Sequence, residues 1–76
     1  MTPEQLLAFE SAHPHHSSHR DERIRRELGI TPVRYAVLLL RAASSAEGIR
    51  ADPLTARRVR EGAERRARMR EMRTAA

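Results

Sequence analysis

The stretch Leu28-Gly29-Ile30-Thr31-Pro32 ends one amphipathic helix and begins another within a few residues. Gly29 suits the left-handed backbone conformation that ends many helices. The Thr31 hydroxyl suits the cap of the next helix, and Pro32 suits its first position, where no N–H is needed. The sequence therefore predicts two helices joined by a short turn, the arrangement of a helix-turn-helix.

Helices are also predicted on the N-terminal side of this turn. Thr2-Pro3-Glu4-Gln5 has the pattern of a capping box, which predicts a first helix to about Ser11. The histidines, proline and serines over 13–19 break any helical periodicity and indicate a loop. We expect Ser18 or Asp21 to cap the second helix, which ends at the turn.

The third helix is the most apolar part of the chain. At 100° per residue, its core-facing stripe is formed by Tyr35, Leu38, Leu39 and Ala42. A connector follows, and Asp52-Pro53 then opens a fourth helix that runs to about Arg73. We therefore expect an all-α, three- to four-helix domain with a central helix-turn-helix over residues 1–64, and an Arg-rich C-terminal helix extension or tail over 65–76.

The charge of the chain is unevenly distributed. All fifteen basic residues are arginine, and residues 1–49 carry six arginines and six acidic residues. Residues 50–76 carry nine arginines and four acidic residues, so the whole net charge of +5 lies in this last third. Such one-sided positive charge is typical of proteins that bind the phosphate backbone of nucleic acids. The alternative is a solvated helix in which glutamates pair with arginines four residues away.

The turn can be compared with the packing that a DNA-binding helix-turn-helix requires. With Gly29 as the turn glycine, the positions that must be apolar are Ile24, Leu28, Ile30, Tyr35 and Leu38, and all five comply. Arg25 departs from the pattern. The two helices approach each other closely at its position, where a small side chain is usual. The alternative reading is an ordinary pair of antiparallel helices.

These patterns lead to two competing hypotheses about function. As a small DNA-binding regulator, the chain would contact bases through Thr31 and Arg34 and phosphates through Arg41, Arg57, Arg58, Arg60, Arg65 and Arg66. As a protein-interaction module, it would dock a second copy or the transcription machinery. The outward face of the third helix favours the second hypothesis, because it carries Val33, Val37 and Leu40, which offer no hydrogen bonds to bases.

Other function classes have little support. A chain this small without a phosphate-binding glycine loop or a nucleophile constellation is not expected to be an enzyme or to need a cofactor. Four histidines, at positions 13, 15, 16 and 19, would suit a metal only if the 15 and 19 pair were helical, so we expect a solvated linker and no metal site. The absence of cysteine and of a long apolar run favours a cytoplasmic protein without membrane contact.

The sequence resembles a small actinobacterial and actinophage family of unknown function with a predicted helix-turn-helix fold. The resemblance covers most of the chain and lies at Leu6-Leu7-Ala8-Phe9-Glu10, Arg26-Glu27-Leu28-Gly29-Ile30-Thr31, Arg34-Tyr35, Ala51-Asp52-Pro53-Leu54 and Arg57-Arg58. The turn is also similar to the DNA-binding region of sigma factors. Both resemblances imply an all-α fold that binds DNA, although that family favours polar residues where this chain has Val33, Val37 and Leu40.

Overall fold

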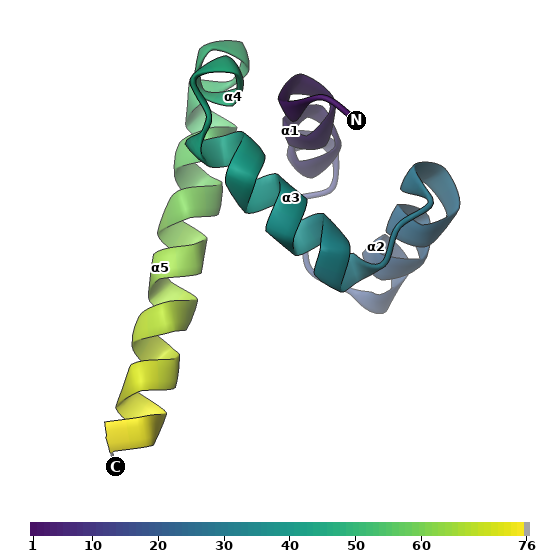
Figure 1. Cartoon of the computed structure of the whole chain (residues 1–76). Coiled ribbons are helices and arrows are strands. Elements are labelled where there is room, and N and C mark those ends of the chain that lie inside the picture. The colour runs from purple at the N-terminus through teal and green to yellow at the C-terminus, as the bar shows by residue number, and fades with distance from the viewer. Residues whose placement is uncertain (76) are drawn as a thin grey trace.

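The computed structural model describes residues 1–75, which fold into helices joined by short turns (Figure 1). The predicted all-α class is confirmed. The described residues form five α-helices and one π-helical segment, which is close to the expected three to four helices: α1 (Pro3–Ala12), α2 (Ser18–Arg23), η1 (Ile24–Leu28), α3 (Pro32–Ser44), α4 (Ala46–Ala51) and α5 (Pro53–Ala75).

The N-terminal helix begins as its sequence predicts. The Gln5 N–H donates to the Thr2 hydroxyl at 3.1 Å, and the Thr2 N–H donates to the Gln5 side chain at 2.9 Å, which completes a capping box. The cap of α2 is different from our expectation. Ser17 has extended backbone angles and its hydroxyl accepts from the Arg20 N–H at 3.1 Å, so neither Ser18 nor Asp21 caps this helix.

The expected connector after α3 contains the extra helix, α4. The Ser45 hydroxyl donates to the Ala42 carbonyl at 2.8 Å and accepts from the Gly48 N–H at 3.0 Å, so one side chain ends α3 and starts α4. Gly48 is buried, and a Cβ at this position would lie only 1.9 Å from the Ala42 oxygen. Asp52 then caps α5 by accepting from the Thr55 N–H at 3.1 Å.

The core lies where α1 and the first half of α5 pack against α3 (Figure 1). Its buried apolar side chains are Leu6, Leu7, Phe9, Ile24, Tyr35, Leu39, Ala42, Ala43 and Ala56. The predicted stripe of α3 therefore faces inward, although Leu38 is only half-buried at the edge. Beyond its docked half, α5 extends away from the rest of the molecule, so its arginines are presented to solvent.

Candidate nucleic-acid interface

The turn before α3 has the local geometry that its sequence predicts. Gly29 adopts the left-handed conformation, with φ 69° and ψ 23°, and its N–H donates to the Arg25 carbonyl at 3.1 Å. The Thr31 hydroxyl accepts from the Arg34 N–H at 3.1 Å, and Pro32 is the first residue of α3. The hydroxyl of Thr31 keeps its own proton for a further partner, because a hydroxyl both accepts and donates.

Arg25 lies in the π-helical segment η1 and points to solvent. Within this segment Ile24 is fully buried and Leu28 half-buried, while Arg25 is exposed to solvent. The expected crowding at Arg25 therefore does not arise. Instead Arg25 lines a shallow depression over the turn together with Gly29, Ile30, Thr31 and Arg34.

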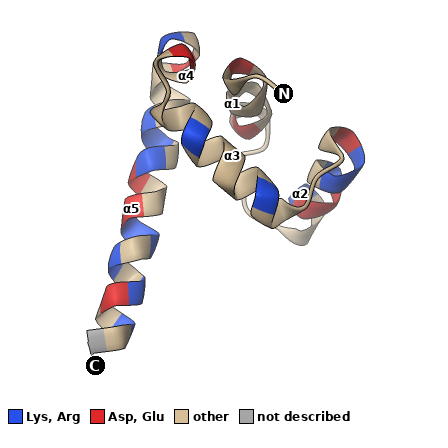
Figure 2. Ribbon diagram, in the orientation of Figure 1, with Lys and Arg blue, Asp and Glu red and all other residues tan. Residues whose placement is uncertain are grey.

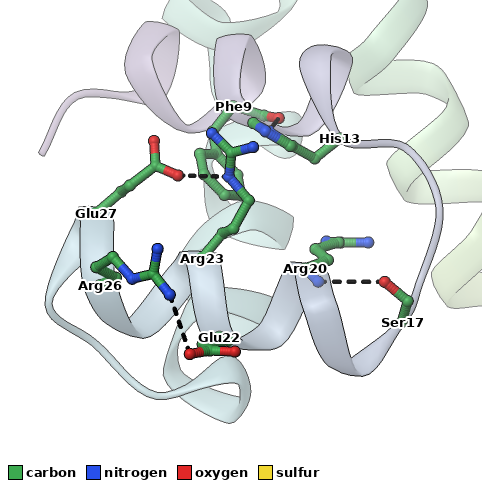
Figure 3. A network of polar contacts seen from close by, with 8 residues as sticks. All are labelled: Phe9, His13, Ser17, Arg20, Glu22, Arg23, Arg26 and Glu27. Carbon is green, nitrogen blue, oxygen red and sulfur yellow. Dashed lines mark hydrogen bonds and ion pairs between the residues drawn. The ribbon is translucent and has the colours of Figure 1, made fainter.

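Ion pairs occupy the other arginines on this side of the turn (Figure 3). Arg23 Nε donates to Glu27 Oε2 at 2.6 Å, and Arg26 Nη2 donates to Glu22 Oε1 at 3.0 Å. The contact from Arg23 also holds the pKa of the Glu27 carboxyl below its usual value. Both pairs are spaced four residues apart on an exposed helix, so they leave Arg25 and Arg34 as the arginines available beside the turn.

The outward face of α3 is apolar and uncovered. Val33 is 77% exposed, Val37 44% and Leu40 40%. Helix α5 packs on another side of α3 and does not cover these three side chains. Arg34 and Arg41, the predicted contacts to base and phosphate, are exposed beside them. This face therefore combines a hydrophobic strip with two cations.

The arginines of α5 are in different situations. Arg57 donates to Glu61 at 2.9 Å. Arg60 reaches back across the interface and donates to the Ala43 carbonyl, where it satisfies an unpaired group at the end of α3. The remaining predicted phosphate contacts, Arg58, Arg65 and Arg66, are exposed. In Figure 2 the basic positions of α3 and of α5 can be seen from the same side of the molecule.

A buried polar cluster joins α1, α2 and α3, and our sequence analysis did not find it. Glu10 Oε1 accepts from Arg20 Nη2 at 2.7 Å and from the Tyr35 hydroxyl at 2.9 Å. Burial raises the pKa of Tyr35 above its usual range, and the neighbouring Glu10 carboxylate adds to this shift. One signal was available: a tyrosine predicted to point inward needs a partner for its hydroxyl.

Within this cluster the guanidinium of Arg20 is almost completely enclosed. The residue is 5% exposed, and its Nε and Nη1 atoms are buried without a hydrogen-bond acceptor among residues 1–75. Its Cζ lies 5.3 Å from the centre of the Tyr35 ring, so the aromatic face is the remaining partner of this cation. The cluster thus fixes the position of α2 and η1, and with them the turn before α3.

The histidine segment contains no assembled metal site. His13 Nδ1 donates to the Phe9 carbonyl at 3.0 Å, and the His13 ring stacks on the Phe9 ring at 4.4 Å. His15 and His16 lie in the loop and His19 in α2, so the helical spacing that a pair of ligands would need is not formed. No group of three or more metal-ligating side chains occurs among the described residues.

Comparison with known proteins adds one finding to this geometry. A family model described as "Protein of unknown function (DUF3263)" matches residues 2–71. The chain belongs to this family. No curated protein and no solved structure gives a significant match.

The DUF3263 match extends from the capping threonine of α1 into the last turns of α5. It therefore includes the turn, the exposed face of α3 and the α5 arginines up to Arg70. No helix in the described part of the chain is both long and apolar enough to cross a lipid bilayer.

Proposed function

We propose that this chain is a small DNA-binding protein of the helix-turn-helix type that regulates transcription. The observation that carries the proposal is that the positive charge is concentrated in one part of the chain and is exposed there. Residues 50–76 hold the whole net charge of +5, and α5 displays most of these arginines on a helix that leaves the core. A polyanion with regularly spaced phosphates is the partner that such a surface favours.

The geometry around the turn supplies the part that would read sequence. The first turns of α3 enter the major groove, where the guanidinium of Arg34 is able to donate two hydrogen bonds to a guanine edge. The free donor of Thr31 lies beside it. Val33 and Val37 contact thymine methyl groups in this arrangement, because aliphatic side chains recognise no other feature of a base edge.

The backbone contacts come from exposed arginines on both helices. Arg41, Arg58, Arg65 and Arg66 are exposed and make no ion pair within residues 1–75. We leave Arg57 and Arg60 out of the interface, because Arg57 is paired with a glutamate and Arg60 caps the end of α3.

The proposal is tested by selecting preferred sequences from random duplex DNA and measuring their affinity by fluorescence anisotropy. Arg34→Ala should abolish the preference for the selected sequence. Arg26→Ala is the matched control, since it removes the same charge from an exposed helix but from an arginine already paired with Glu22. Equal behaviour of the two variants would contradict a role of Arg34 in base recognition, and no binding at low salt would refute the function itself.

A second candidate function follows from the uncovered strip on α3. Exposed contiguous aliphatic side chains commonly mark a protein partner site. In this case Val33, Val37 and Leu40 dock another protein, and the arginines of α5 are solvated. Val37→Asp tests it: loss of a complex, measured by light scattering, with an unchanged helical spectrum favours the interaction module.

A further inference from the structure

Gly62 is an unusual residue at the end of the docked half of α5. It is buried, although most of the residues around it are exposed. A Cβ at this position would meet only two atoms within 4 Å, Arg66 Nη1 at 3.4 Å and Arg65 Nη2 at 3.6 Å. Two guanidinium groups therefore lie over the bare backbone of this glycine.

Neither backbone strain nor core packing requires a glycine here. Gly29 is the only glycine with positive φ among the described residues, so Gly62 has ordinary helical angles. Its missing side chain makes room for no neighbouring helix, in contrast to Gly48, which touches the Ala42 carbonyl. A glycine inside a helix lowers helix stability relative to alanine. At this position the glycine instead lets the guanidinium groups of Arg65 and Arg66 lie close to the helix backbone.

The side chains around Gly62 are mostly basic. A depression on α5 is lined by Gly62, Arg65, Arg66, Met69, Arg70 and Arg73. At 100° per residue these positions share one half of the helix, and Glu64 and Glu71 lie on the other half. The four arginines make no ion pair within residues 1–75. The depression is thus a cationic seat with no acidic side chain in its lining.

We infer that Gly62 creates a phosphate seat on α5, in which one phosphodiester group of bound DNA is held by the guanidinium groups of Arg65 and Arg66, both of which lie within 4 Å of the position of the missing Cβ. The inference rests on the proposed DNA binding. It assigns one defined phosphate contact to α5, in place of a general electrostatic attraction between the helix and DNA. Guanidinium groups suit this role because they donate paired hydrogen bonds to phosphate oxygens. Arg70 and Arg73 line the same depression beyond these two arginines.

A comparison of two arginine variants distinguishes a defined phosphate site from general electrostatic attraction. Arg65→Ala and Arg68→Ala each remove one positive charge from the same exposed helix, but only Arg65 lines the depression. We expect Arg65→Ala to weaken binding to a fixed DNA duplex about tenfold or more, as for a lost charge-assisted hydrogen bond. Arg68→Ala should change the affinity by about threefold or less. Equal losses would overturn the seat.

A second variant fills the seat without changing any charge. Gly62→Leu should weaken DNA binding about tenfold, as for the loss of a hydrogen bond to a charged group. Its melting temperature should be unchanged or higher, because leucine favours a helix more than glycine. Ala67→Leu, outside the lining of the depression, is the control and should bind as the unaltered chain does. Gly62→Leu with unaltered affinity would refute the seat and leave DNA binding intact, whereas an unaltered chain that binds no DNA would refute both.

Discussion

The buried contact between Glu10 and Arg20 allows the sharpest prediction about the fold. Glu10→Gln removes the charge that balances a guanidinium whose side chain is 6% exposed, while it keeps the size of the side chain. Breaking a buried ion pair costs about 3–5 kcal/mol because one charge stays behind uncompensated. Glutamine still offers an oxygen to the Tyr35 hydroxyl, so we expect a loss at the lower end, about 3 kcal/mol.

This loss is large for a chain of this size. At about 0.05–0.15 kcal/mol per residue, a domain of 76 residues has a free energy of unfolding of roughly 4–11 kcal/mol. Urea unfolding followed by circular dichroism measures it directly. Glu22→Gln is the control, because it breaks an exposed pair with Arg26 and should cost only about 0.3–0.5 kcal/mol. If the two variants lose the same stability, the buried cluster does not hold α2 in place as described.

Two further predictions concern the helix junctions. Gly48→Ala places a Cβ against the Ala42 carbonyl and should cost about 1–3 kcal/mol in the same urea assay, and an unchanged midpoint would contradict the close packing of α3 and α4. Hydrogen bonds from Thr55 hold the pKa of Asp52 below its usual value, so this carboxylate stabilises the fold above its unfolded pKa near 3.9, and the contribution disappears as pH falls through the folded pKa. Asp52→Ser keeps a cap without the titration, and should therefore lose less stability than the unaltered chain between about pH 5 and about pH 2.

The helix ends were predictable because their signals are local. A cap depends on a side chain and a backbone N–H two or three residues away, so Thr2, Thr31 and Asp52 could be recognised one after another along the chain. The left-handed Gly29 was predictable for the same reason. Helix α4 was missed because six residues are too few to show a hydrophobic period.

The features that depend on distant residues were not predictable. Glu10 and Tyr35 are 25 residues apart in sequence, and Arg60 and Ala43 are 17 apart, so no spacing rule connects them. For the candidate site, the helical period correctly placed Val37 on the exposed face of α3. It could not distinguish an arginine that caps a neighbouring helix from one that is free to bind phosphate, because that depends on how α5 docks.

The most direct test of the central claim is the salt dependence of binding to duplex DNA. Four phosphate contacts, from Arg41, Arg58, Arg65 and Arg66, predict a slope of about −3.6 for the logarithm of the association constant against the logarithm of salt concentration. Affinity should then fall roughly 150-fold between about 50 mM and about 200 mM salt. Replacing Arg65 and Arg66 by alanine should reduce the slope by about 2. A slope near zero, or one that these substitutions do not change, would contradict the account.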